Sequence, residues 1–430
     1  MQLSGHTMTC EVAVMNKYAI VIAADSAVTT TDSSGLERYS KGGNKIFQLS
    51  NDQPVGVMIF GSAMLDGMPW EIIIKAYRSS AAGTSYAALA EYCAAFFTFV
   101  KNAGHLFSAA DRDKNYRDCL NAAARDLLQS GRSTFPVIDD TSKTNAERKA
   151  AWEQFLADRD AELNGLPLHA EIALADFEQA TQSIANFIPS DADTFLQIEG
   201  LTNIVDTAGW FSSACVYFFK CHNSILSATG IVFSGFGADQ YFPEVVAYDV
   251  QGFVGNSFVF SKQQANSCQI SHNQPSAIFQ FAMTSSIDAF TTGLDIGVFS
   301  QVRASYEAEL TKFGQSLLGT ANVQVPVDFD VQVTNSRDAF CKDWVPKVYD
   351  LHYHPMKRVI ASLPIEEMTH LAETLVVLQS LKERVTSPRQ SVGGPIDVAV
   401  ITKSEGLVWI KRKHFFDQDK NLRYVLRQKH

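Results

Sequence analysis

Runs of apolar residues separated by short polar breaks dominate the first hundred residues. Residues 10–15 and 18–24 form two such runs around the polar pair Asn16-Lys17, a pattern typical of a β-hairpin. The second run is almost continuously apolar, which indicates a strand buried on both faces. The same reasoning predicts strands over residues 45–49 and 55–60, and helices around residues 70–77 and 86–100.

The middle of the chain has a different pattern. Residues 102–195 are rich in Asp, Arg, Ala and Gln, with helical stretches expected at 146–161 and 170–184. Strand patterns resume afterwards and need partners, so we interpret residues 102–223 as a helical insertion; a separate helical domain is the alternative. The later elements expected are strands over 230–237, 244–250, 252–260, 396–402 and 407–411, and helices over 285–293, 298–317 and 365–385. Residues 322–349 are mixed in pattern, and a second insertion is expected at about 315–360.

Segregated blocks of strands and helices indicate layered sheets with helices outside. The predicted fold class is therefore α+β, a four-layer αββα sandwich of two antiparallel sheets with helical insertions. The main domain is expected to span residues 9–411. Residues 1–8 are then a propeptide or an upstream start, and residues 412–430 a C-terminal tail.

Composition narrows the function. The chain has 430 residues and a formal net charge of −10, so long-range attraction to nucleic acid is not expected. The basic run Lys411-Arg412-Lys413 fits an exposed strand end or a subunit contact.

Seven cysteines, an odd number without a CxxC pair, favour a reducing compartment. The longest apolar runs are too short to span a bilayer. We expect a soluble, cytoplasmic protein.

Four short motifs follow one another in the first 67 residues: Thr9-Cys10-Glu11-Val12, Ala23-Ala24-Asp25-Ser26, Lys45-Ile46-Phe47 and Phe60-Gly61-Ser62-Ala63. Their order resembles the proteasome β-subunit family of N-terminal-nucleophile (Ntn) hydrolases, as a divergent bacterial member. The spacing from Thr9 to Asp25, 25 − 9 = 16 positions, matches that family. The spacing from Asp25 to Lys45, 45 − 25 = 20, is longer than usual. The resemblance covers residues 9–100 and 224–411.

The resemblance implies a threonine hydrolase with Thr9 as the nucleophile. A hydroxyl needs a base, and a free α-amine with a pKa of about 7.7–8.0 can serve as one. The resemblance also implies that Lys45 lowers the pKa of the hydroxyl, that Asp25 orients Lys45, and that the backbone amide of Gly61 forms the oxyanion hole. Ser391 is the nearest polar substitute for a missing family residue.

That missing residue is an aspartate expected three positions before a Ser-Gly-Gly segment; here the segment reads Ser391-Val392-Gly393-Gly394. A family arginine is replaced by Ala27, and another serine is absent, with Ser285 or Ser286 as stand-ins. These departures leave open a weak, altered or inactive enzyme.

The expected reaction is cleavage of an amide bond through an acyl-enzyme, and the resemblance implies a peptide as the substrate. The alternatives are a non-catalytic assembly or binding protein and a small-molecule amidohydrolase. No cofactor or metal is expected, and His352-x-His354 fits a surface loop better than a metal site. A homo-oligomer, ring or spiral, is expected; an unfoldase partner is unknown.

The start of the chain limits this chemistry, because residues 1–8 precede Thr9 and occupy its α-amine in a peptide bond. Translation from Met8 followed by trimming would expose Thr9. Autocatalytic cleavage after Met8 is the other route.

Overall fold

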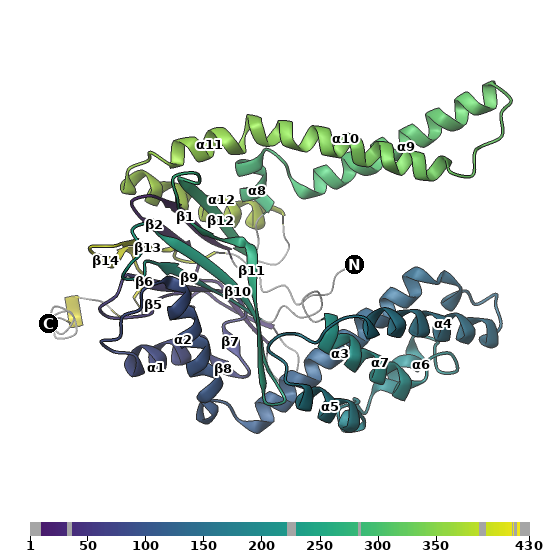
Figure 1. The fold of residues 1–430 in the computed structure, drawn as a ribbon, viewed down its shortest axis with the longest axis horizontal. Helices are drawn as coiled ribbons and strands as arrows, with labels where there is room; N and C mark the ends of the chain where they lie inside the picture. Colours follow the sequence, from purple (N-terminus) through teal and green to yellow (C-terminus); the bar gives the residue numbers. More distant parts are fainter. Residues whose placement is uncertain are drawn as a thin grey trace.

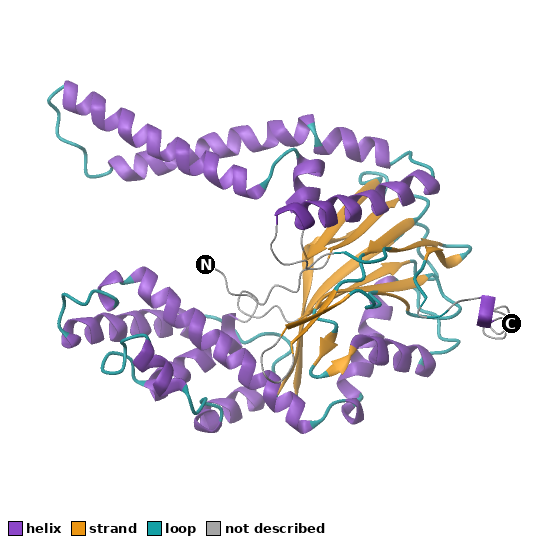
Figure 2. Ribbon diagram, turned by 180° about the vertical axis from the view of Figure 1, so that it is seen from behind, coloured by secondary structure: helices purple, strands orange, loops and turns teal. Residues whose placement is uncertain are grey.

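The computed structural model describes residues 10–31, 37–221, 229–282, 285–386, 393–414, 416 and 419–421. Two five-stranded antiparallel sheets form the body of the protein (Figures 1 and 2). The first, sheet A, has the order β12 (Ser276–Ala282), β1 (Cys10–Asn16), β2 (Ile20–Ala24), β13 (Asp397–Thr402) and β14 (Gly406–Lys411). The second, sheet B, has the order β11 (Ser257–Gln269), β10 (Glu244–Val254), β9 (Thr229–Gly235), β6 (Val55–Gly61) and β5 (Ile46–Gln48).

The two sheets pack face to face through an apolar layer that includes Met15, Ile22, Phe236 and Ile401. On its other face, sheet A is covered by the long helix α12 (Ile365–Thr386). Sheet B is covered by α1 (Trp70–Ser80) and α2 (Leu89–Asn102). The mixed α and β composition and the two antiparallel sheets confirm the coarse fold prediction.

A helical unit lies beside the far end of the β10–β11 hairpin (Figure 1). It has its own apolar core, to which Val254 and Val259 of that hairpin contribute. Its elements are α3 (Ala109–Thr134), α4 (Asn145–Asn164), α5 (Leu174–Ser183), α6 (Ala192–Ile198) and α7 (Thr207–Cys221), with 3-10 turns at Gly104–Leu106, Pro136–Ile138 and Ile184–Asn186.

A second helical projection is a hairpin that extends from the α12 side of the body (Figures 1 and 2). It consists of α9 (Ile296–Thr320) and α10 (Phe329–Leu351), which carries Pro346 inside the helix. The sequence pattern of residues 322–349 did not predict α10. The hairpin joins the body through α8 (Ser285–Thr292) and α11 (Tyr353–Ile360).

Two strand assignments differ from the prediction. The predicted break near residue 251 lies inside β10, and the turn instead falls at Gly255, whose φ of 62° favours glycine. Strand β12, which pairs along the whole of β1, was not predicted.

The small strands are β3 (Val28–Thr31), β4 (Glu37–Ser40), β7 (Met64–Leu65) and β8 (Met68–Pro69), and a last 3-10 turn spans Asp419–Asn421. Within the described ranges, no helix is both long enough and apolar enough to cross a bilayer.

Candidate active site

Three charged side chains meet in the interior between the two sheets. Glu11 belongs to β1, Asp25 follows β2, and Lys45 precedes β5. The ammonium of Lys45 lies 3.0 Å from Glu11 Oε1 and also donates to Asp25 Oδ1. The carboxylate side chains are 0% exposed and that of Lys45 is 4% exposed. We call these three residues the charged cluster.

The strand pattern explains how the cluster forms. Side chains alternate between the two faces of a strand. Cys10 and Val12 pack on the α12 side of sheet A, so Glu11, between them, points toward sheet B. Lys45 enters from sheet B, where its backbone O accepts from Ile59 N at 2.9 Å. The lysine of one sheet therefore reaches the carboxylates of the other.

Asp25 ties the cluster to the start of β1. Its Oδ1 accepts a hydrogen bond from Cys10 N at 3.1 Å, and its own backbone N donates to Cys10 O at 3.2 Å. Its Oδ2 accepts from Gly393 N at 2.9 Å. A single buried carboxylate thus joins the first described residue, Lys45 and the segment that leads into β13.

The electrostatics fix the charge of Lys45. Burial by itself lowers the pKa of Lys45, but the neighbouring carboxylates of Glu11 and Asp25 outweigh it and raise the pKa above its usual value. Lys45 is therefore an ammonium ion at neutral pH and is not a proton acceptor there. Burial, followed by the charges of Glu11 and Asp25, raises the pKa of the Cys10 thiol well above its usual value. Cys10 is therefore unsuited to act as a thiolate nucleophile.

The residues predicted for the site fall into two groups. Asp25 and Lys45 are in direct contact, and Gly61 ends β6 with a φ of 75°. Thr9 and Ser391 lie outside the described residues. Their near neighbours in sequence both reach Asp25, however, since Cys10 follows Thr9 and Gly393 lies two residues after Ser391.

Sequence reasoning missed Glu11 and the backbone N–H of Gly393. Glu11 did carry a usable signal, because a carboxylate inside an otherwise apolar strand needs a buried partner. Gly393 carried none, since a backbone contact leaves no trace in residue type. The suggested substitutes Ser285 and Ser286 both bond to α12: Ser285 Oγ accepts from Lys382 at 3.2 Å, and Ser286 N donates to Gln379 Oε1 at 3.0 Å.

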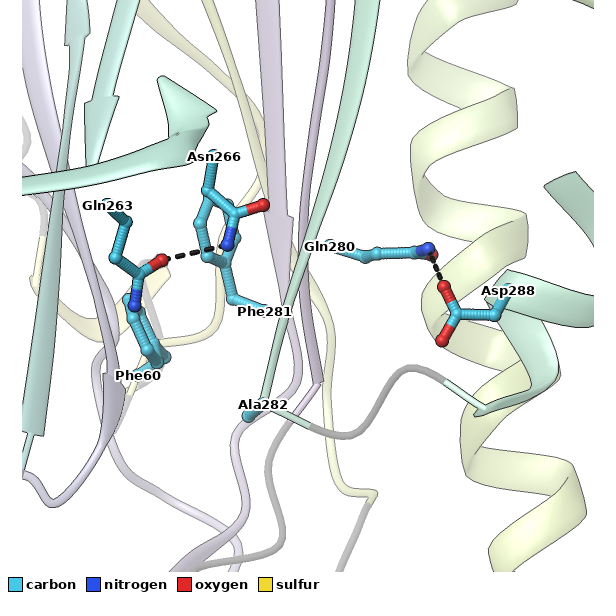
Figure 3. A pocket seen from close by; sticks show the side chains of 7 residues that line it. All are labelled: Phe60, Gln263, Asn266, Gln280, Phe281, Ala282 and Asp288. Atoms are coloured by element: carbon cyan, nitrogen blue, oxygen red, sulfur yellow. Dashed lines mark hydrogen bonds between the residues drawn. The ribbon is translucent and has the colours of Figure 1, made fainter. Parts of the chain in front are cut away.

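A cavity of about 360 Å³ opens where β12 ends (Figure 3). Ala282, the last residue of β12, is the cross-strand partner of Cys10, and Phe281 is the partner of Glu11. The cavity therefore adjoins the start of β1. Its lining includes residues on both faces of β12, since Phe281 lies on the side of the charged cluster and Gln280, the partner of Val12, lies on the α12 side. Across the described ranges, no group of three or more His, Cys, Asp or Glu side chains is arranged to hold a metal ion.

The fold and site together define a two-sheet sandwich with a buried lysine–dicarboxylate cluster at the first strand. No family model matches the chain, and no curated protein matches it. Solved structures similar to it include Anbu (ancestral beta-subunit) from Yersinia bercovieri, at 11% identity and a TM-score of 0.27, covering 97% of this chain and 96% of that one. Another is the helical assembly of the Anbu complex from Pseudomonas aeruginosa, at 10% identity and a TM-score of 0.27, covering 98% and 93%.

These findings correct the predicted family. The assignment to the proteasome β-subunit family of Ntn hydrolases was wrong, since no family model matches and a TM-score of 0.27 carries no argument for a shared fold. The motifs behind the assignment are short, and Asp, Ser and Gly are common in turns of any fold. The site must therefore be argued from its own geometry.

Proposed function

We propose that the protein is a hydrolase that cleaves an amide bond through an acyl-enzyme on Thr9, once Thr9 is the first residue. The observation that carries this proposal is the burial of Lys45 at the start of β1. Asp25 Oδ1 accepts from both Lys45 Nζ and Cys10 N, and Cys10 N is bonded to the carbonyl carbon of Thr9. A positive charge therefore lies two hydrogen bonds away from the amide nitrogen of Cys10, the residue that follows the proposed nucleophile.

In the proposed reaction, Thr9 Oγ1 attacks the carbonyl carbon of the substrate and its proton passes to the free α-amine of Thr9. The amine returns that proton to the leaving nitrogen as the C–N bond breaks, which leaves an ester on Thr9. Water then attacks the ester, with the same amine as base, and releases the carboxylic acid. The atoms of Thr9 are restored at the end of the cycle.

The residues of the charged cluster have different proposed roles in this reaction. Because Lys45 keeps its proton at neutral pH, it stabilises the developing alkoxide by charge and leaves the base role to the α-amine. Asp25 and Glu11 hold the ammonium in place. Gly61, with its positive φ at the end of β6, is the proposed source of the oxyanion-hole amide.

The decisive test is the state and reactivity of residue 9. N-terminal sequencing of protein from its native host is expected to find Thr9 first. An electrophilic probe that reacts with N-terminal threonine should then add its mass to the Thr9 peptide. Thr9→Ala should abolish labelling. Thr98→Ala, which removes an exposed threonine of α2, should label like the wild type. Retention of Met1 on all molecules, or equal labelling of Thr9→Ala, would exclude the proposed nucleophile.

A non-catalytic binding or assembly role is the second candidate, and the α9–α10 hairpin favours it. Phe313 and Leu317 on α9 and Val331 on α10 are each more than half exposed, as are Val323, Val325 and Val327 in the connecting loop. An exposed group of large apolar side chains is typical of an interaction surface. The expected homo-oligomer would cover such a surface with a second copy.

A further inference from the structure

A second cavity lies where the helical unit meets the tip of the β10–β11 hairpin (Figure 1). Helix α3 lines it with positions 109, 112, 113 and 116, and α5 with positions 176, 179, 180 and 183. Both sets have the spacing of a single helix face, so the two helices present these side chains to one space. The turn at Gly255 and Asn256 forms a third side. The volume is about 470 Å³, within the range of small-molecule sites.

Arg112 is the cation of this cavity. Its guanidinium carbon lies 4.1 Å from the centroid of the Phe253 ring and 5.9 Å from that of Phe107. A Cβ on Gly104, which lines the cavity, would lie 3.4 Å from Arg112 Nη2. Arg112 Nε is buried and has no hydrogen-bond partner among the described residues. Asp66 is close enough to interact with this charge, but it accepts from Phe253 N and does not line the cavity. A buried unpaired donor is costly, and an acceptor on a ligand would satisfy it.

The cavity also has two carboxylates. Asp113 follows Arg112 on α3 and has no ion-pair partner within the described ranges. Asp176 of α5 accepts from Ser257 Oγ through its Oδ2. Its Oδ1 lies near the turn, since a Cβ on Gly255 would be 3.6 Å from that oxygen. Asp176 Oδ1 is therefore placed to accept from a ligand. Arg112 and the two carboxylates together carry a formal charge of −1.

The inner walls of the cavity are aromatic. Tyr116 is 5% exposed and Phe219 is 1% exposed. The ring of Phe187 packs edge-on against that of Tyr116, with a centroid distance of 4.6 Å. The hydroxyl of Tyr116 is 3.7 Å from Cys215 Sγ, so it is already engaged. These walls suit an apolar or aromatic group. Asp113, in contrast, is exposed, so the charged end of the cavity is at the surface.

The charges of opposite sign determine the class of ligand. An anion without a cationic group would pair with Arg112 but would also meet two carboxylates. A cation without an anionic group would leave the buried Nε donor of Arg112 unpaired. A molecule that carries both a carboxylate and an ammonium satisfies both sides with charge-assisted hydrogen bonds. The side-chain amides of Gln179 and Asn256, which can donate and accept, also line the cavity.

We infer that this cavity binds a free α-amino acid with a large apolar or aromatic side chain. Arg112 receives the carboxylate, Asp113 and Asp176 hold the ammonium, and the aromatic walls enclose the side chain. The site shares no residue with the charged cluster or with the cavity at β12, and its binding requires no reaction at Thr9. Because α3, α5 and the β10–β11 turn all line it, a bound amino acid should stabilise the contact between the helical unit and sheet B.

The test titrates L-phenylalanine into the full chain by calorimetry beside three analogues. Phenethylamine lacks the carboxylate, hydrocinnamate lacks the ammonium, and L-alanine lacks the ring. L-phenylalanine is expected to bind about tenfold or more tightly than each analogue, because each analogue loses one set of contacts. Equal affinity for phenethylamine or for hydrocinnamate would identify a simple cation or anion site and overturn the inference. The absence of binding by L-phenylalanine, L-tryptophan and L-leucine at millimolar concentration would also overturn it.

Variants then assign the binding to this cavity. Arg112→Gln should lower the affinity for L-phenylalanine about tenfold or more and leave that for phenethylamine nearly unchanged. The double variant Asp113→Asn/Asp176→Asn should weaken phenethylamine binding and not hydrocinnamate binding. Lys114→Gln and Glu178→Gln change charge in the same directions on the same two helices, outside the lining, and should bind L-phenylalanine like the wild type. Circular dichroism checks the fold, and Asp113→Asn alone, at an exposed position, decides if the other cavity variants do not fold. Wild-type affinity in every folded cavity variant would place the ligand elsewhere and overturn the inference.

Discussion

Replacement of Lys45 by methionine tests the charged cluster most directly. Methionine keeps the unbranched stem and removes only the charge. Lys45 is buried between Glu11 and Asp25, so the variant removes the lysine ammonium that separates these two carboxylates. We therefore expect Lys45→Met to lose activity and also stability, a double effect that a surface lysine would not have.

The size of the stability loss follows from the geometry. At the 3.0 Å separation of Lys45 Nζ and Glu11 Oε1, an effective dielectric constant of about 20 gives an attraction of about 5 kcal/mol. Part of that loss is recovered when one carboxylate takes up a proton. The expected decrease in the free energy of unfolding at pH 7 is about 3–5 kcal/mol, as for other broken buried pairs. Lower pH should narrow the difference, since protonation relieves the repulsion.

The double variant Glu11→Gln/Lys45→Met separates stability from chemistry. It leaves one carboxylate, so its cluster has the same formal charge of −1 as the wild type. Urea denaturation should show that it recovers about 2 kcal/mol or more relative to Lys45→Met, with an unchanged m-value. Probe labelling of Thr9 should remain lost in both variants. A Lys45→Met protein within about 1 kcal/mol of the wild type would refute the reasoning, because the cluster would then not be a desolvated ion network.

Three further predictions concern other parts of the molecule. Burial raises the pKa of Asp66 from 3.8 to about 7, so the native state holds a proton that the unfolded chain releases. The free energy of unfolding should therefore fall by about 3 kcal/mol between pH 4 and pH 7. Asp66→Asn should remove most of that pH dependence in urea denaturation measured across this range. A Cβ on Gly237 would lie 2.2 Å from the backbone O of Ala87, so Gly237→Ala should lower the free energy of unfolding by about 1–3 kcal/mol. In the control variant Gly319→Ala, the added Cβ in α9 meets nothing within 4 Å. That variant should be neutral or slightly stabilising in the same urea denaturation assay. Light scattering should give the mass of a homo-oligomer that Phe313→Ser weakens; a monomer mass at every concentration would contradict the assembly prediction.

The body of the fold could be predicted because its strands carry strong local patterns. The β1–β2 hairpin, the β9 strand and the α12 helix all follow from hydrophobic runs or helical spacing. Strand β12 was missed although its sequence, SAIFQFA, is mostly apolar. Its role depends on a partner more than two hundred residues away, and no local signal reveals such pairing. Helix α10 was missed because a proline and scattered polar residues blur its periodicity.

The site was only partly predictable for the same reason. Asp25 and Lys45 were expected to pair only because the short motifs that contain them resemble those of a known family. Their contact joins two different sheets, and the pairing of Glu11 with the same lysine depends on the stacking of those sheets. The family assignment failed at this level, since a correct order of short motifs does not establish a match over the whole chain.

The charged cluster is not what stabilises the sandwich, and this bears on its purpose. Desolvation of three charges costs several kcal/mol for each ion, and well-packed apolar residues of similar volume are often as stable or more so. The layer between the sheets already has the apolar residues for such packing, among them Ala13, Ile46 and Met58. A cluster with a formal charge of −1 in that layer is therefore a cost that the surrounding core must offset. Perturbed charges of this kind gather at functional sites. The charged cluster lies where β1 begins, a single residue after Thr9, and the neighbouring cavity has a buried acceptor, Gln280 Oε1, without a hydrogen-bond partner among the described residues. The charged cluster costs desolvation free energy and lies next to the proposed nucleophile in the sequence. These two facts together are the reason for proposing a reaction at the start of β1.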